Sequence, residues 1–213
     1  MSSSSTRNPH GDTLANRRNP QMNRFILHMP ASMPGVRCYV DSSTPPGHLQ
    51  LTTRMAGLGI FFVNTQVQPV QTIYIKARMS GAHSVLMAEA AALAVAALIN
   101  QSLSFTNTTF LSDCQQLVEF LNQPDLTHPP DWRMKCFTQI FHNSTLHQQA
   151  RIFKIDRRQN TTADSLARQA FSDFHLLSEP TCSYMHQQQQ CPLMAALNSV
   201  LLQDVLILSA SCC

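Results

Sequence analysis

Residues 70–99 read Val70-Gln-Thr-Ile-Tyr-Ile-Lys-Ala-Arg-Met79, then a five-residue link, then Val85-Leu-Met-Ala-Glu-Ala-Ala-Ala-Leu-Ala-Val-Ala-Ala-Leu-Ile99. In the first segment apolar and polar residues alternate, which predicts a half-buried strand. The second segment is rich in Ala and Leu and follows Ser84, a favourable N-cap, so it predicts a helix. The change from the alternating pattern of a strand to the pattern of a helix indicates a fold that packs helices on a sheet.

Shorter segments on both sides of this stretch extend the pattern. We expect strands at 36–40, 57–63, 108–111 and 151–155, and helices at 113–121, 131–143 and 160–174. Gly57 and Gly59 within the second strand indicate a bulge or a close backbone approach. Apolar residues from Trp132 to Phe141 can share one helix face. Three strands followed by alternating helices and strands predict an α/β layer fold with a mixed sheet.

Charged residues are scarce in this chain. Of 213 residues, 15 are Lys or Arg and 12 are Asp or Glu, so that 13% are charged, against about a quarter in an average globular protein. The hydrophobic share of 44% excludes a charged, disordered chain. The net charge of +3 is compatible with an anionic partner.

The length suits one domain with an extension at each end. We place the domain at residues 34–175. Residues 1–33 lack the apolar core of a secretory signal and predict a disordered extension, with an organellar transit peptide as the alternative. Residues 176–213 are expected to form a tail with a short helix. Its apolar stretch, 192–210, is either a helix added to the domain or a partner-binding element.

The sequence contains no apolar run long enough to span a bilayer. It contains seven Cys without a Cys-x-x-Cys pair, which indicates reduced thiols.

Because carboxylates are few, the position of each is informative. Asp41 and Asp113 each follow a predicted strand, Glu89 lies among apolar helix residues, and Asp164 lies at the start of the last helix. If the two strands are neighbours, these carboxylates converge at one edge of the sheet, where their repulsion favours divalent cations. Oxygen ligands alone favour Mg²⁺ or Mn²⁺. Two such ions suit phosphodiester hydrolysis.

Each carboxylate also has a purely structural interpretation. Asp113 and Asp164 are candidates for helix capping, with Gln116 and Thr161 as partners. Asp41 is a candidate for the first residue of a Ser/Pro turn, and Glu89 for a first-turn acid that leans outward. The sequence leaves these alternatives open for single residues, whereas the four positions together favour a metal site.

Taken in order, five segments resemble the plant-type ribonuclease H-like domain found alone and at the ends of plant retroelement polyproteins. The likeness covers about residues 34–175. Its segments are Pro34-Gly35 with Tyr39-Val40-Asp41-Ser42-Ser43, Ala56-Gly57-Leu58-Gly59, Ala88-Glu89-Ala90-Ala91-Ala92-Leu93, Leu111-Ser112-Asp113-Cys114-Gln115-Gln116-Leu117-Val118, and Arg157-Arg158-Gln159-Asn160-Thr161-Thr162-Ala163-Asp164-Ser165-Leu166-Ala167. No segment is specific alone, but their order and spacing are.

The resemblance implies a five-stranded mixed sheet of order 3-2-1-4-5 flanked by helices. It also implies endonucleolytic hydrolysis of the RNA strand of an RNA–DNA hybrid with two Mg²⁺ or Mn²⁺ ions. Asp41, Glu89, Asp113 and Asp164 match the family's four metal-binding acids. The bacterial relatives carry a His shortly before the last acid, whereas here that stretch reads Lys154-Ile155-Asp156-Arg157-Arg158.

Basic residues near these segments are candidates for phosphate contacts. They are Arg133, Lys135, Arg151, Lys154, Arg157 and Arg158. A solvated loop is the alternative for the pair Arg157 and Arg158. We therefore expect a monomeric RNA–DNA hybrid ribonuclease in the nucleus or cytoplasm, with an organelle left open by the N-terminus. The alternatives are a catalytically weak or dead nucleic-acid-binding module and a retroelement-derived interaction protein.

Overall fold

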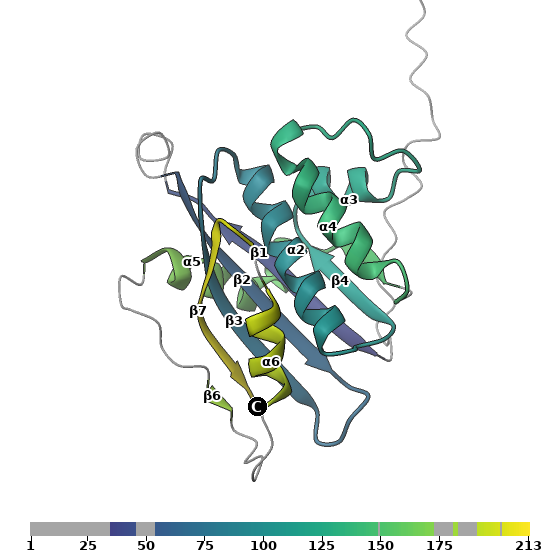
Figure 1. Cartoon of the computed structure of the whole chain (residues 1–213), viewed down its shortest axis with the longest axis vertical. Helices are drawn as coiled ribbons and strands as arrows, with labels where there is room; N and C mark the ends of the chain where they lie inside the picture. The colour runs from purple at the N-terminus through teal and green to yellow at the C-terminus, as the bar shows by residue number, and fades with distance from the viewer. Residues whose placement is uncertain (1–34, 46–53, 149, 173–180, 183–190, 201) are drawn as a thin grey trace, which may run out of the picture.

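The computed structural model describes residues 35–45, 54–148, 150–172, 181–182, 191–200 and 202–213 (Figure 1). The predicted extension at 1–33 lies outside these residues. Along the chain the elements are β1 (Val36–Ser43), β2 (Met55–Asn64), β3 (Gln71–Ser80), α2 (Val85–Ser102), β4 (Thr108–Ser112), α3 (Gln115–Leu121), the 3₁₀-helix η1 (Trp132–Met134), α4 (Lys135–Thr145), β5 (Arg151–Lys154), the 3₁₀-helix η2 (Arg157–Gln159), α5 (Thr161–Ser172), β6 (Thr181–Cys182), α6 (Pro192–Ser199) and β7 (Val205–Cys212).

The strands form one mixed sheet in the order β5-β4-β1-β2-β3-β7-β6. β1, β2 and β3 are antiparallel neighbours, whereas β4 runs parallel to β1 and β5 runs parallel to β4. The predicted α/β fold, with its central order 3-2-1-4-5, is confirmed. The predicted number of five strands is wrong, because among the described residues β7 and β6 extend the sheet beyond β3 to seven strands.

The C-terminal strand β7 was not predicted. The sequence predicts a single element for the apolar stretch at 192–210, but a turn at Gln203–Asp204 separates α6 from β7. β7 pairs antiparallel with β3, with Ala210 opposite Ile75. The predicted short helix corresponds to α6, which buries Leu193 and Ala196. The described residues from 191 onward are therefore part of the packed fold.

Helix α2 lies in the core, on the face of the sheet that α4 and α6 also cover (Figure 1). All residues from Ala88 to Ala97 are buried, so the helix is covered on all sides, and its small Ala side chains let its neighbours approach. Ser84 caps it as predicted, accepting the N–H of Met87 at 3.1 Å. α2 is long and apolar enough to cross a membrane by length and composition, but 67% of it is buried inside this fold.

Helix α5 covers the opposite face of the sheet at the two glycines of β2 (Figure 1). A Cβ atom at Gly57 would lie 2.0 Å from the carbonyl oxygen of Ala167, and one at Gly59 would lie 2.0 Å from that of Ala163. Real Cβ atoms do not approach this closely, so only glycine permits the contact. The prediction of a close backbone approach is confirmed.

Two helices begin later than predicted. α3 starts at Gln115 rather than at Asp113, because the turn after β4 includes Asp113 and is held by the Cys114 N–H, which Ser112 Oγ accepts at 3.1 Å. The segment from residue 131 divides into η1 and α4. Trp132 is therefore off the buried face and 75% exposed, contrary to the prediction, because the period of a 3₁₀ turn differs from that of an α-helix.

We expect Gly59→Ala to destabilise the protein by about 3 kcal/mol, because the added Cβ would lie 2.0 Å from the carbonyl oxygen of Ala163 and 2.6 Å from the nitrogen of Ala167. Both are backbone atoms that cannot rotate away. Gly81→Ala is the control. Its φ is +71° and its Cβ would contact nothing, so only backbone strain of about 1 kcal/mol is expected there. Urea unfolding measures both values, and equal losses would contradict the packing of α5 on β2.

Candidate metal centre

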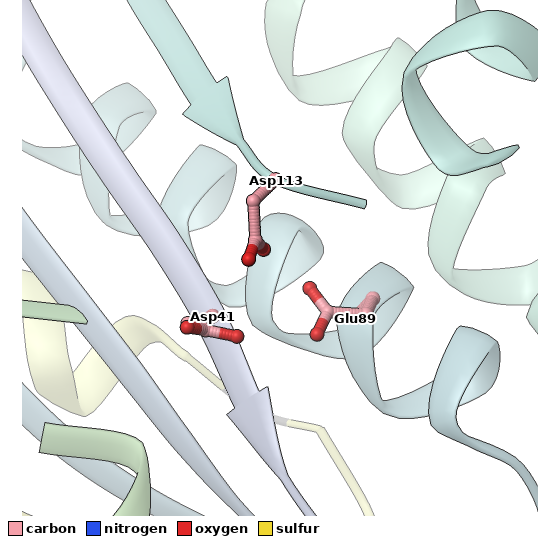
Figure 2. A group of neighbouring side chains, drawn as sticks. All are labelled: Asp41, Glu89 and Asp113. Atoms are coloured by element: carbon pink, nitrogen blue, oxygen red, sulfur yellow. The ribbon is translucent and has the colours of Figure 1, made fainter. Parts of the chain in front are cut away.

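Three carboxylates from three separate elements meet at the end of the sheet. Asp41 lies in β1, Glu89 in the second turn of α2, and Asp113 directly after β4. One oxygen of each lies within 4.8 Å of the others, and Figure 2 shows the three side chains pointing toward one another. This group is the acidic convergence predicted from the sequence, for three of its four members.

The register of the parallel strands explains the meeting of the two aspartates. Tyr39 of β1 pairs with Leu111 of β4. Asp41 and Asp113 each follow their paired residue by two positions, so they lie side by side at the point where β4 ends, while β1 continues to Ser43. Glu89 reaches the same point because α2 packs across β1, with Ala88 and Ala92 also buried in the core.

The structure contradicts the capping and turn interpretations of these three residues. Asp41 is 3% exposed within a strand that continues to Ser43, and Glu89 is 4% exposed rather than leaning outward. The N-cap of α3 is Cys114, whose side chain makes no capping hydrogen bond. Asp113 is therefore not the cap, and its side chain is only 7% exposed.

Two carboxylate oxygens at this point are buried without a hydrogen-bond partner among the described residues. They are Oδ2 of Asp41 and Oε2 of Glu89. A buried, unpartnered carboxylate oxygen is costly unless a cation binds it or a proton neutralises it. The arrangement thus has the unsatisfied acceptors that a bound cation would satisfy.

Burial and mutual repulsion both act on the ionisation of the group. The pKa of Asp41 is raised from 3.8 to about 6, chiefly by burial and then by the charge of Asp113, while the N–H of Ser42 opposes the shift. Burial, followed by the charge of Asp41, raises the pKa of Glu89 well above its usual value. In the metal-free protein the cluster therefore holds protons that separate carboxyl groups would release.

Ser42 holds two of the carboxylates in place. Its hydroxyl donates to Oε1 of Glu89 at 2.7 Å, and its backbone N–H lies 2.8 Å from Oδ1 of Asp41 and 3.2 Å from Oε1 of Glu89. No role for Ser42 is predicted from the sequence. Its position directly after Asp41 was the available signal, but the partner is 47 residues away.

Asn160 connects the strand of Asp41 to the helix of Asp164. Its side-chain NH2 group donates to the carbonyl oxygen of Val40 at 2.9 Å, and its backbone carbonyl oxygen accepts the N–H of Asp164 at 3.0 Å. The residue is fully buried. This role of Asn160 is also not predicted from the sequence, because a single Asn before a helix resembles an ordinary cap.

Asp164, the fourth predicted acid, lies next to the group rather than within it. Its Oδ1 accepts a hydrogen bond from Nε of Arg168 at 3.0 Å, one turn along α5. Its negative charge still contributes to the raised pKa of Asp41. The side chain is 29% exposed, more than that of Asp113.

The predicted phosphate-binding residues occupy two regions. Arg151 and Lys154 are the first and last residues of β5, and Arg157 and Arg158 lie in η2; all four are exposed. Nε of Arg157 donates to Oδ2 of Asp113 at 3.0 Å. Arg133 and Lys135 lie at η1 and the start of α4. There Arg133 stacks over the ring of Trp132 at 5.6 Å and pairs with Asp131 at 3.7 Å.

The residues present fit a hard divalent cation. The three donors are all carboxylates, two of their oxygens lack a partner, and the group is partly closed to water. Mg²⁺ and Mn²⁺ prefer oxygen ligands of this kind. A soft-metal site would instead require thiolate or imidazole ligands.

Comparison by sequence finds one family. The sequence model of a family described as reverse transcriptase-like matches residues 47–170, more than half of the chain. The matched span includes Glu89, Asp113 and Asp164, whereas Asp41 precedes it. No curated protein matches this chain.

Comparison by structure finds similar folds at low sequence identity. The protease–reverse transcriptase of prototype foamy virus has a TM-score of 0.53 and 17% identity, over 68% of this chain and 22% of the viral one. LC9-RNase H1 has a TM-score of 0.50 and 12% identity, over 66% and 74%. RNase H1 of Halobacterium salinarum has a TM-score of 0.49 and 19% identity, over 64% and 96%. At such identities the first two structures show a ribonuclease H-like fold and nothing beyond the fold.

We expect Asp41→Asn to stabilise the metal-free protein at pH 7. Because the folded-state pKa of Asp41 is raised, its contribution to stability is present below about pH 4 and is lost as the pH rises through about 6. The gain on substitution should therefore grow from near zero at pH 4 to at most about 3 kcal/mol at pH 7. Urea unfolding in EDTA measures it, and a gain independent of pH would contradict this account.

Ser42→Ala should weaken Mg²⁺ binding and move its pH midpoint upward, because Glu89 loses a hydrogen bond that favours its charged form. Ser42→Thr retains the hydroxyl and is the matched control. Calorimetric Mg²⁺ titrations between pH 6 and 8 test the effect. Identical binding by the Ala and Thr variants would show that the hydroxyl does not act on Glu89.

Proposed function

The chain belongs to the reverse transcriptase-like family, and on this premise we propose that it is a metal-dependent ribonuclease that cleaves the RNA strand of an RNA–DNA hybrid. The observation that carries the proposal is the meeting of Asp41, Glu89 and Asp113, with two buried oxygens unsatisfied. A structural role does not explain such a cluster, because it destabilises the metal-free fold at neutral pH.

Asp41, Glu89 and Asp113 would hold the metal, with Asp164 beside them as the proposed fourth ligand residue. We propose two Mg²⁺ or Mn²⁺ ions, as in the family that the sequence resembles. When bound, such ions lower the pKa of a coordinated water and offset the negative charge that develops on a phosphodiester during hydrolysis. Ser42 keeps Glu89 oriented, and the amide of Asn160 keeps the end of β1 against α5.

Basic side chains on two segments of the described chain support a nucleic-acid partner. Lys154 and Arg158 are exposed on one side, while Arg133 and Lys135 lie on another segment, and side chains of this kind bind phosphates. A ribonuclease specific for a hybrid must also detect 2′-hydroxyl groups, which alone distinguish the RNA strand. The plant-type and retroelement-derived origin, the monomeric state and a nuclear or cytoplasmic location belong to the same proposal.

A specific observation favours a second candidate, a nucleic-acid-binding module with weak or no catalysis. Two of the four acids already have basic partners, since Asp113 pairs with Arg157 and Asp164 pairs with Arg168. These pairs partly neutralise the acids without any metal. In both ion pairs the arginine side chain is largely exposed to water, so each pair contributes little to the stability of the fold. Such weak pairs do not prevent metal binding.

We predict that wild-type protein nicks the RNA strand of a labelled hybrid in Mg²⁺ or Mn²⁺ and that Asp113→Asn lowers the rate by at least about a hundredfold, since even groups that support metal ligands contribute about 10–100-fold. Asp125→Asn, which alters an exposed acid in a loop outside this cluster, is the control. Single-stranded RNA, RNA duplex and DNA duplex of the same sequence test specificity. Hybrid binding without cleavage by wild-type protein would establish the second candidate.

A further inference from the structure

Arg157 is an exposed basic residue that forms an ion pair with one acid of the carboxylate cluster. Its Nε donates to Oδ2 of Asp113 at 3.0 Å, across 44 residues of sequence. Asp113 is one of the three acids whose oxygens lie within 4.8 Å of one another. The guanidinium therefore neutralises part of the charge that a metal ion would neutralise.

The two partners of this pair differ in their exposure. The side chain of Asp113 is 7% exposed, whereas that of Arg157 is 80% exposed. An arginine in water gains little from one exposed ion pair. Arg157 can therefore leave Asp113 at small cost, while the buried oxygens of Asp41 and Glu89 remain unsatisfied until a cation arrives.

The backbone that carries Arg157 is anchored on both sides. Asp156 accepts the N–H of Arg158 at 3.0 Å and forms a capping box with Gln159 around η2. Asn160, directly after η2, binds the carbonyl oxygen of Val40 in β1. A change of partner by Arg157 therefore requires only rotation of its side chain, not movement of the segment.

We propose that Arg157 is an exchangeable cation of the metal centre: it pairs with Asp113 in the metal-free protein, a divalent cation displaces it, and the released guanidinium binds a nucleic-acid phosphate at the edge of the site. The last step rests on the proposed function, and the first does not. The two uses compete for one side chain, because the guanidinium must turn away from Asp113 to place two of its N–H groups on a phosphate at the edge of the site.

Electrostatics supports the order of these events. A guanidinium at Asp113 and a divalent cation bound to the same carboxylate would repel at short range. A cation that also reaches the unpartnered oxygens of Asp41 and Glu89 satisfies more acceptors than Arg157 does. Arginine outside the cluster is then suited to a phosphate, which it can bind through two parallel hydrogen bonds.

The first test measures metal affinity without any nuclease assay. Calorimetric Mg²⁺ and Mn²⁺ titrations of Arg157→Gln should show about two- to fivefold tighter binding than wild type, as the loss of one competing exposed ion pair requires. Arg158→Gln removes a neighbouring exposed charge that has no contact with Asp113 and should bind metal as wild type does. Unchanged or weaker binding by Arg157→Gln would overturn the proposal, because it would show that Arg157 does not compete.

The second test measures release of the guanidinium in EDTA, where no metal-dependent cleavage occurs. Asp113→Asn removes the partner of Arg157, so adding Arg157→Gln should then reduce the salt dependence of binding to a labelled RNA–DNA hybrid by about one phosphate contact. In the wild-type background the same substitution should have little effect. Equal effects in both backgrounds, or no hybrid binding at all, would overturn the phosphate step.

If the first test succeeds and wild-type protein still cleaves no hybrid, the metal exchange stands and the proposed ribonuclease activity fails. If hybrid is cleaved but Arg157→Gln binds metal no more tightly, the activity stands and the exchange fails. The two conclusions are thus separable.

Discussion

The contact on which the rest of the site depends is the close approach of α5 to β2. Gly57 and Gly59 lack the Cβ atoms that would strike the helix backbone 2.0 Å away. Gly59 pairs across the sheet with Asp41, so this contact lies beside the carboxylates. It places Asn160 against Val40, and it brings η2 and Arg157 to the open side of Asp113. A wider spacing between α5 and β2 would move η2 and Arg157 away from the carboxylates.

The carboxylate cluster lowers the stability of the metal-free fold at neutral pH. Burial and like charges raise the pKa values of Asp41 and Glu89, so ionisation at neutral pH weakens the metal-free fold. The surrounding structure tolerates this because α2 is otherwise apolar and fully packed from Ala88 to Ala97. Ser42 and Arg157 lessen the repulsion by different means, one through a short hydrogen bond and the other through an exposed charge. With a tightly bound cation, the carboxylate cluster would stabilise the fold instead of destabilising it.

Much of the central fold could be predicted because its signals are local. Alternation at 70–79, the Ala-rich run at 85–99 and the strands that lead to Asp41 and Asp113 each depend on neighbouring residues. The predicted end of the first strand before Asp41 is wrong, because β1 continues to Ser43. The extra strand β7 was missed because its pairing with β3 joins residues more than 120 apart. Trp132 was misplaced because nothing in residues 131–143 marks the change from a 3₁₀ turn to an α-helix. Ser42 and Asn160 went unassigned for the same reason as β7, since their partners are 47 and 120 residues away.

The sequence by itself determined which residue types stand at the ends of strands and within the core helix, and hence the acidic character of the site and its preference for hard cations. It also determined the two glycines that allow close packing. The tertiary structure alone decided which acids meet, which oxygens remain unsatisfied and that Arg157, rather than Arg158, reaches Asp113. The physical reason is range: helix and strand signals act over a few residues, whereas the meeting of charges depends on how distant elements pack. In this chain that packing is set where α5 contacts β2 beside Asp41.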